Sequence, residues 1–191
     1  MRILTIKTQV PNSVFLKLEQ APKEMRRGLK DAVNEMARQT GEDIRNKVME
    51  DYTLKASLFR KGDVRMNRAT NSKLMAKLTI EGGPISLKKG YKTRKNTKHL
   101  AVRAKVKKGP GFKELKKGKS FKAFITRVQT GHEGIYHYDI FQRESSSKLP
   151  IKIFQGPGRA KLSEKIFEQL KGKREMELKR RINMMAERIM Q

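Results

Sequence analysis

The charge of this chain constrains its fold more than any other feature of the sequence. The 191 residues contain 46 Lys and Arg but only 19 Asp and Glu, which gives a formal net charge of +27. Self-repulsion of this size opposes a compact state unless an anionic partner or a neighbouring subunit supplies negative charge. Nucleic acid and an acidic protein surface both meet that requirement, and the charge does not distinguish between them.

The composition also limits the size of the core. Hydrophobic residues make up 36% of the chain and aromatic residues 6%, with no Trp. These values lie below those of a typical globular domain but above those of a wholly disordered chain. We therefore expect a small core, with some apolar surface buried only against a partner or another copy of the chain. The absence of Cys excludes disulfides and thiolate metal sites.

The sequence carries neither a secretion signal nor a membrane-spanning pattern. Its opening, "MRILTIKTQVPNS", lacks the apolar region and the small-residue cleavage site of a signal peptide. No window approaches the roughly 18 uncharged apolar residues that a spanning helix requires. We therefore expect a soluble protein that is not exported.

Hydrophobic periodicity predicts an α+β fold. Apolar residues recur at steps of three and four over residues 22–49 and again from about 161, which predicts a long N-terminal amphipathic helix and a C-terminal helix interrupted near Gly172. Alternating apolar and polar residues predict five or six antiparallel strands, in segments that include "RILTIKT", "KLMAKLTI" with its partner "PISLKKG", "LAVRAKVKK" and "FKAFITRV". We expect the helices to pack on one partly barrel- or sandwich-like sheet, with a core over 1–160 and a helical extension over 161–191.

A lysine-rich segment, residues 88–119, is a candidate electrostatic surface. It holds 14 basic residues, 12 of them Lys, against the single acid Glu114. Lysine is a flexible point charge, so binding here would use nucleic-acid phosphates without sequence preference. In the alternative interpretation, the segment is a mobile, solvated loop whose lysines prevent exposed strand edges from pairing with other strands. Its only aromatic residues, Tyr91 and Phe112, are fewer than a single-strand binder needs. The candidate contacts to DNA or an acidic partner are Lys88, Lys89, Lys92, Arg94, Lys95, Lys98, Lys107, Lys108, Lys116 and Lys117.

Three motifs suggest chemistry but lack the context that it requires. "GHEGIYHYD" groups His132, Glu133, His137 and Asp139, but without the helical His spacing of a zinc site, so we interpret them as surface polar residues. "SSSK", residues 145–148, matches the Ser-x-x-Lys of acyl enzymes but lies in a polar loop without the companion motifs. "GPGF" and "GPGR" are turns, not phosphate loops. We therefore predict no catalytic residue, metal, cofactor or enzymatic activity.

Residues 138–158, "YDIFQRESSSKLPIKIFQGPG", concentrate the scarce aromatic and β-branched residues around a polar patch. The stretch ends at a Gly-Pro-Gly that neither a helix nor a central strand tolerates. It predicts a hairpin followed by a turn toward the C-terminal helix.

Residues 121–158 resemble the core of the phage minor tail protein Z family and related tail-completion proteins. In that family an Ala-Phe strand leads to a Gly-His-x-Gly-(Ile/Val) turn, a Phe-x-Arg strand, a polar loop, "LPI" and a terminal "GPS". The matching positions are Ala123-Phe124, Gly131-His132, Gly134-Ile135, Phe141-Gln142-Arg143, Leu149-Pro150-Ile151 and Gly156-Pro157. The resemblance extends upstream to about residue 30. The chain departs from the pattern in a longer "YHYDI" segment and in Gly158, where the family has Ser.

The resemblance implies a structural protein that caps the upper end of a phage-type tail tube as a ring and joins the tail to the head. Its partners would be further copies, hexameric by the resemblance, tail-tube, terminator or connector proteins, and DNA passing through the lumen. It would be located in the neck of a virion or tail-like particle, and in the host cytoplasm during assembly. The hairpin residues expected at the subunit or partner interface are Tyr138, Ile140, Phe141, Arg143, Leu149, Pro150, Ile151, Ile153 and Phe154.

The sequence also permits one alternative function, from a different class of protein. A non-specific nucleic-acid-binding protein could contact the phosphate backbone through residues 88–119.

Overall fold

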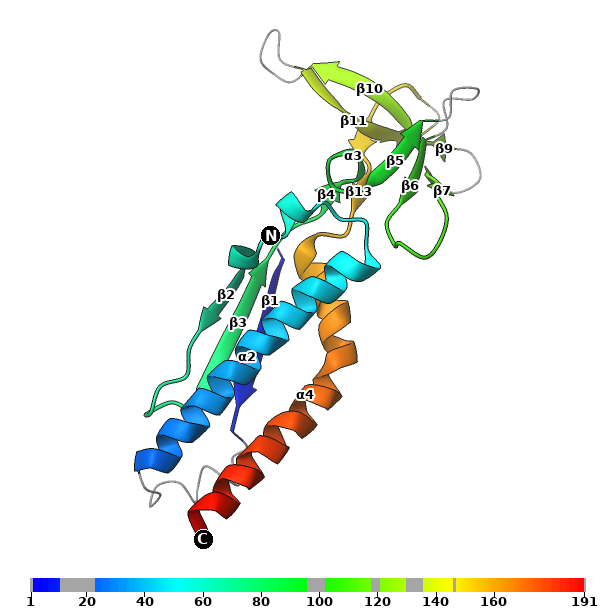
Figure 1. The fold of residues 1–191 in the computed structure, drawn as a ribbon. Helices are drawn as coiled ribbons and strands as arrows, with labels where there is room; N and C mark the ends of the chain where they lie inside the picture. The colour runs from blue at the N-terminus through cyan, green and yellow to red at the C-terminus, as the bar shows by residue number, and fades with distance from the viewer. Residues whose placement is uncertain are drawn as a thin grey trace. The chain divides into compact units, whose positions relative to one another are not determined.

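A computed structural model describes residues 2–10, 23–95, 102–117, 121–129, 136–145 and 147–190 (Figure 1). Helices and several antiparallel sheets together confirm the α+β class. The helices are α2 (Lys23–Asp51), α3 (Leu87–Gly90) and α4 (Arg159–Met190), with 3-10 turns η2 (Ala56–Leu58) and η3 (Lys61–Asp63). The strands are β1 (Ile3–Gln9), β2 (Val64–Asn67), β3 (Met75–Glu81), β4 (Ile85–Ser86), β5 (Lys92–Lys95), β6 (Val102–Lys105), β7 (Lys113–Glu114), β8 (Lys116–Lys117), β9 (Phe121–Lys122), β10 (Phe124–Gln129), β11 (Tyr136–Arg143), β12 (Ile151–Ile153) and β13 (Gln155–Gly156).

The chain folds into two compact units, each assembled from separate segments. Unit 1 comprises Met1–Lys47, Arg60–Gly82 and Arg159–Gln191, and unit 2 comprises Val48–Phe59 and Gly83–Gly158. The chain passes from unit 2 back into unit 1 at residues 158–159.

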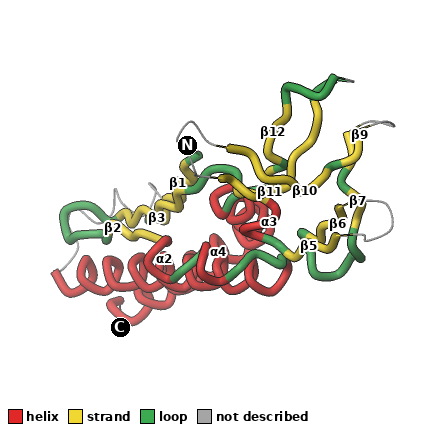
Figure 2. The backbone as a smooth tube through the Cα atoms, turned by 90° about the horizontal axis from the view of Figure 1, so that it is seen from above, coloured by secondary structure: helices red, strands yellow, loops and turns green. Residues whose placement is uncertain are grey.

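Unit 1 combines the antiparallel sheet β1–β3–β2 with α2 and α4. Figure 2 shows the two helices on the same side of this sheet. The alternation predicted for β3 is confirmed, since Ala76, Leu78 and Ile80 are buried while the residues between them are partly exposed. The helices contribute Leu29 and Ile44 from α2, and Leu162 and Ile166 from α4, to the buried residues of the unit.

Glycine plays different roles in the two long helices. A Cβ at Gly41 of α2 would lie 2.9 Å from Cγ1 of Val64 and 3.7 Å from the Leu78 side chain, so the glycine allows α2 to approach β2 and β3 closely. At Gly172 a Cβ would meet no atom within 4 Å. The predicted interruption there is wrong, because α4 is continuous. A mid-helix Gly costs only about 1 kcal/mol relative to Ala, which the packing of so long a helix offsets.

The described residues of unit 2 form four small antiparallel sheets: β10–β11–β12, β5–β6–β7, β4–β13 and β8–β9. The predicted hairpin is confirmed, since Phe141 pairs with Ile153 and Arg143 with Ile151. The described strands do not form the single large sheet that we expected. "PISLKKG" is not the partner of β3: its strand β4 stops after two residues and pairs with β13. There the Ser86 hydroxyl accepts a hydrogen bond from the Lys89 amide (3.2 Å) and caps α3.

The Gly-Pro-Gly that ends the hairpin is a packing site. A Cβ at Gly156 would lie 2.8 Å from both the Leu87 and Tyr91 side chains, so only glycine allows this approach. The Tyr91 hydroxyl donates to the Pro157 carbonyl, and burial raises the pKa of Tyr91. The chain then enters α4, as the predicted turn requires.

Candidate interaction surface

A buried carboxylate fixes β11 within unit 2. Oδ1 of Asp139 accepts a hydrogen bond from the Ser86 hydroxyl (2.7 Å) and another from the Ile140 amide (2.7 Å). The Asp139 side chain is fully buried, as are those of Ile140 and Phe141. This bond ties the middle of β11 to the junction of β4 and α3, and so fixes which side chains of β11 remain at the surface.

Two tyrosines of β11 are exposed on one face of the β10–β11 pair. Tyr136 and Tyr138 are two residues apart and therefore share a face, opposite Gln129 and Arg127 of β10. Their side chains are 52% and 51% exposed, whereas Tyr52 and Tyr91, also in unit 2, are buried. The four tyrosines of the chain thus divide into two core residues and two surface residues.

Each exposed tyrosine carries a cation over its ring. Nζ of Lys88 lies 2.9 Å from the Tyr138 ring centroid and donates to the Tyr138 carbonyl (3.2 Å). Cζ of Arg127 lies 4.8 Å from the Tyr136 ring centroid. Such pairs hold a cation at an aromatic surface without cancelling its charge. We call Tyr136, Tyr138, Lys88 and Arg127 the tyrosine face.

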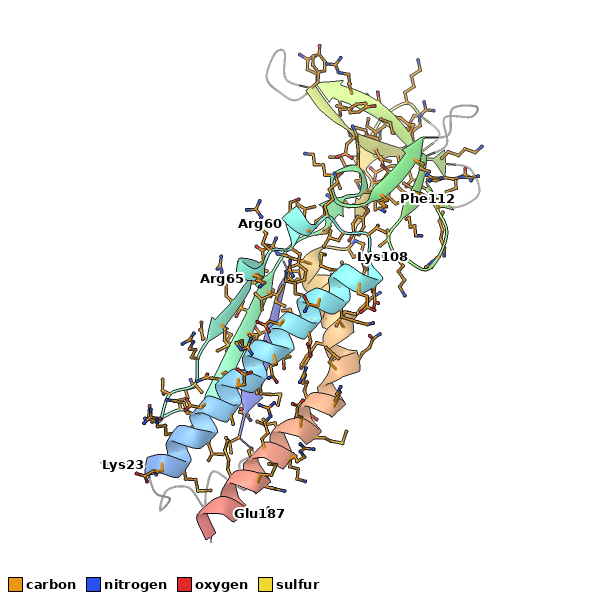
Figure 3. The ribbon with its side chains drawn as sticks, viewed as in Figure 1. Lys23, Arg60, Arg65, Lys108, Phe112 and Glu187 are labelled. Atoms are coloured by element: carbon orange, nitrogen blue, oxygen red, sulfur yellow. The ribbon has the colours of Figure 1, made fainter. Side chains whose placement is uncertain are left out.

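A second basic surface lies on β5 and β6. Lys92 is directly opposite Lys105 and Arg94 is opposite Arg103, with Glu114 of β7 beside Arg103. Like charges directly opposite each other destabilise a strand pair. Cζ of Arg94 also lies 4.5 Å from the ring centroid of Phe112, which is labelled in Figure 3. We call Lys92, Arg94, Arg103 and Lys105 the cationic face.

The candidate lysines lie on several elements of unit 2. In the described part of segment 88–119, these elements are α3, strands β5–β8 and the turns between them. Lys88 is partly exposed, and the exposed candidates are Lys89, Lys92, Arg94, Lys107 and Lys108. Lys98 lies outside the described residues, as do the side chains of Lys95, Lys116 and Lys117. Arg103 and Lys105 were not among the predicted contacts, although the alternation in "LAVRAKVKK" places both on the face opposite to that of the buried Val102 and Ala104.

The hairpin residues proposed for an interface differ in exposure. Ile140 and Phe141 are buried within unit 2, so they hold the hairpin to its own unit, and Ile151 and Phe154 are partly buried. The hairpin residues that remain exposed to a partner are Tyr138, Arg143, Leu149, Pro150 and Ile153. Leu149 is the most exposed of these apolar side chains, at 69%. Lys152 and Glu144 form an ion pair across the hairpin.

The residues of the "GHEGIYHYD" and "SSSK" motifs form no recognisable catalytic or metal-binding arrangement where the structure describes them. Ser145 and Ser147 share a hydrogen bond (2.6 Å), and Ser147 donates to the Leu149 carbonyl (2.8 Å), so both belong to the hairpin turn. His132, Glu133 and the His137 side chain lie outside the described residues. Over the described parts of the chain, no three His, Asp or Glu side chains are grouped as metal ligands. Within the same parts, no helix is long and apolar enough to cross a membrane.

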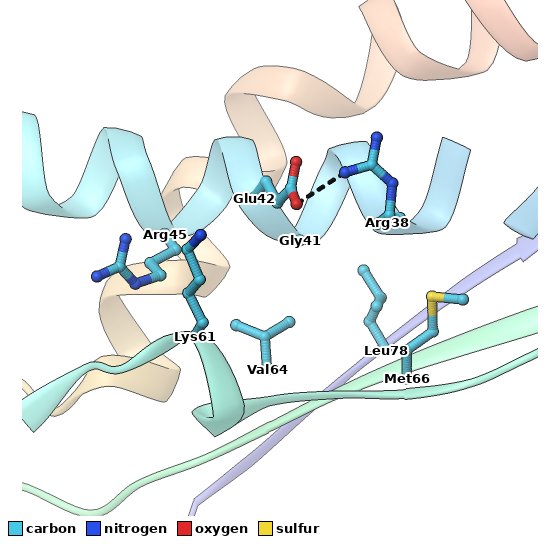
Figure 4. Close-up of a pocket in the computed structure, with 8 residues that line it drawn as sticks. All are labelled: Arg38, Gly41, Glu42, Arg45, Lys61, Val64, Met66 and Leu78. Carbon is cyan, nitrogen blue, oxygen red and sulfur yellow. Dashed lines mark hydrogen bonds and ion pairs between the residues drawn. The ribbon is translucent and has the colours of Figure 1, made fainter. Parts of the chain in front are cut away.

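Two cavities among the described residues of unit 1 lie between its helices and strands. One of about 150 Å³ lies between α2 and the η3–β2 segment, lined by Arg38, Gly41, Glu42, Arg45, Lys61, Val64, Met66 and Leu78 (Figure 4). There Arg38 donates to Glu42 (2.8 Å) and to Glu35, and its hydrogen bond lowers the pKa of Glu35. This cavity is smaller than the roughly 300–1,000 Å³ of typical ligand sites. The other, of about 380 Å³, lies between β1, α2 and α4, where Arg174 pairs with Asp43 and Glu177.

No family model, curated protein or solved structure matches the chain in the comparisons that we made. The surfaces described above therefore carry the functional argument, together with the motif order of residues 121–158.

Proposed function

We propose that this protein is a non-enzymatic structural component of a phage-type tail, which completes the tail or joins it to the head as a ring at the upper end of the tail tube. The observation that carries the proposal is the hairpin β11–β12, which has the expected motif order and leaves Leu149 and Ile153 exposed. Two large apolar side chains exposed on one hairpin suit a contact with another chain.

The net charge supports the same proposal. Self-repulsion in a chain of +27 would be offset in an assembly where acidic tube or connector subunits, or DNA in a lumen, lie beside it. The isolated protein would then be monomeric or weakly associated, and assembly would bring further copies into a ring, hexameric by the resemblance. The protein would occupy the neck of a virion or tail-like particle, after assembly in the host cytoplasm.

To test the proposal, the purified protein is mixed with phage-type tail tubes, and capped tube ends are counted in negative-stain images. We expect rings at one end of the tubes, and few of them with the double variant Leu149→Asp, Ile153→Asp. Met176→Asp is the matched control, because Met176 is also exposed but lies on α4 of unit 1. Absence of capping, or equal capping by the hairpin variant, would overturn the proposal.

The cationic face favours a second candidate function, non-specific binding of nucleic-acid phosphates. Fluorescence anisotropy with random duplex DNA at about 150 mM salt separates the two, because non-specific contacts typically give dissociation constants of about 10⁻⁴–10⁻⁶ M. Tighter binding that the double variant Lys92→Gln, Arg94→Gln weakens would favour the second function.

A further inference from the structure

We infer that the tyrosine face of unit 2 binds single-stranded nucleic acid by stacking bases on Tyr136 and Tyr138. Its four residues come from three elements, with Lys88 on α3, Arg127 on β10 and both tyrosines on β11. The inference does not depend on the proposed tail function, because it is argued from a surface within one copy of the chain.

Both rings keep a surface that a base can reach. A cation covers one face of each ring, yet about half of each tyrosine side chain stays exposed. A planar base can therefore stack on the open part of the ring while the cation remains beside it. Stacking on aromatic side chains next to basic groups is the general way in which single strands are bound without sequence preference.

The spacing of the rings suits an extended strand. Two residues along a β-strand separate side chains on one face by about 6.6–6.8 Å. Stacked nucleotides rise by only about 3.4 Å each, so a strand that places bases on both rings must have those bases unstacked from each other. A duplex does not offer such bases unless it pays a few kcal/mol to unstack and unpair them.

The charge of the face is complementary to phosphate. Strand pairing places Ile125, Arg127 and Gln129 of β10 on the same face as Tyr136, Tyr138 and Ile140 of β11, and none of these residues is acidic. Asp139 of β11 is buried and bonded to Ser86, and Glu144 is paired with Lys152. Lys88 and Arg127 can therefore attract a phosphate backbone while the rings take the bases.

The site is distinct from Leu149 and Ile153, the two exposed aliphatic residues of the hairpin that carry the proposed tail function, although Tyr138 is also among the hairpin residues exposed to a partner. Ile153 pairs with Phe141, so it lies on the opposite face of the sheet from Tyr138. Leu149 lies in the turn between β11 and β12. A variant of the tyrosine face can therefore be compared with a variant of the hairpin turn in the same protein.

The chain itself provides the probe, because it contains four tyrosines and no Trp. Titration of the full chain with an oligothymidylate should quench the part of the tyrosine emission that comes from Tyr136 and Tyr138. In parallel, anisotropy of a labelled oligothymidylate measures affinity, with the duplex of the same length as the competitor. We expect the single strand to bind more tightly than the duplex.

The variants separate stacking from charge. Each of Tyr136→Ala and Tyr138→Ala should weaken binding by about fivefold or more, the loss of one stacked base. Tyr136→Phe and Tyr138→Phe keep the ring and should retain the affinity, while Leu149→Ala serves as the control outside the face. Circular dichroism checks that each variant is folded.

Three results would overturn the inference: no binding of the oligothymidylate, equal affinity for the single strand and the duplex, or equal affinity of the Ala and Phe variants. Competition by polyglutamate as strong as that by the single strand would also overturn it, since the face would then bind any polyanion. Tail-tube capping is measured separately, so failure here and failure of the proposed function are distinguishable.

Discussion

Unit 1 contains 26 Lys and Arg residues and 13 Asp and Glu residues, whereas unit 2 contains 20 Lys and Arg residues and only six Asp and Glu residues. In unit 1, basic side chains meet carboxylates, as in Arg2–Glu164 at 2.6 Å, Arg38–Glu42 at 2.8 Å and the pairing of Arg174 with Asp43 and Glu177. In unit 2, Lys152 pairs with Glu144, but four other basic side chains lie over the rings of Phe112, Phe124, Tyr136 and Tyr138.

This difference separates two ways of accommodating positive charge. A carboxylate neutralises its partner, so the charge of the helices in unit 1 is partly cancelled within the chain. An aromatic ring positions a cation but leaves its charge unchanged. Unit 2 therefore presents positive charge and aromatic surface together, which is the combination that an anionic partner with planar groups requires. Four experiments test whether the units differ in this way.

The largest effect is expected from the core of unit 2. If apolar packing holds this carboxylate-poor unit together, Phe59→Ala should lower the free energy of unfolding by about 3–5 kcal/mol, since the Phe59 side chain is fully buried. Chemical denaturation measures the change. Leu149→Ala, at an exposed position, should stay within about 0.5 kcal/mol of the wild type. Similar losses for the two variants would contradict the proposed core.

The buried carboxylate of unit 2 is expected to have the next largest effect. Asp139→Ala leaves the Ser86 hydroxyl and the Ile140 amide without this acceptor, which should lower the free energy of unfolding by about 2–4 kcal/mol. Asp139→Asn keeps one oxygen acceptor and should lose less. If thermal melting ranks the Asn variant below the Ala variant, Asp139 does not act as an acceptor for these two donors.

Arg174 tests the charge pairing of unit 1. Arg174→Ala removes the partner of Asp43 and Glu177, both of which retain some solvent exposure, so we expect a loss of about 1–2 kcal/mol. The loss should shrink when denaturation is repeated at about 1 M salt, because salt screens partly exposed pairs. Lys171→Ala, at an exposed position on the same helix, is the control. A loss that does not change with salt would show that packing, rather than charge, explains the effect.

The smallest expected effect is a pH dependence from the buried tyrosines of unit 2. Burial raises the pKa of both Tyr52 and Tyr91 above the ordinary value of about 10. Above that pH the unfolded chain loses protons that the folded chain keeps, so the free energy of unfolding should fall as the pH rises, while below it their contribution is constant. Tyr91→Phe should show a shallower fall than the wild type. Identical slopes would mean that Tyr91 is not buried.

Local pattern predicted most of the regular structure. The three- and four-residue periods of α2 and α4 and the alternation of β3 are repeated often enough to identify these elements. The prediction that "PISLKKG" pairs with β3 was wrong because its strand is only two residues long and Ser86 also serves as a helix cap. Nothing in a local pattern shows that a short strand will pair with residues 155 and 156 instead of the strand just before it.

The surfaces were less predictable because distant residues form them. Lys88 and Tyr138 are 50 residues apart, and the hydrogen bond between Ser86 and Asp139 is one of the contacts that bring β11 to α3. Tyr136 and Tyr138 lie outside the lysine-rich segment 88–119, so its local pattern did not indicate them as aromatic partners of its cations. Arg103 and Lys105, in contrast, could have been identified from the alternation around Val102 and Ala104.

The division of unit 1 into three segments affects how it forms during translation. Leu162 and Ile166 of α4 belong to the buried residues of this unit, yet they are synthesised after every residue of unit 2. Until the ribosome has released them, the apolar side chains of β1, β3 and α2 lack part of their cover. Nascent chains that stall near residue 158 would therefore expose apolar surface of β1, β3 and α2 and depend on chaperones.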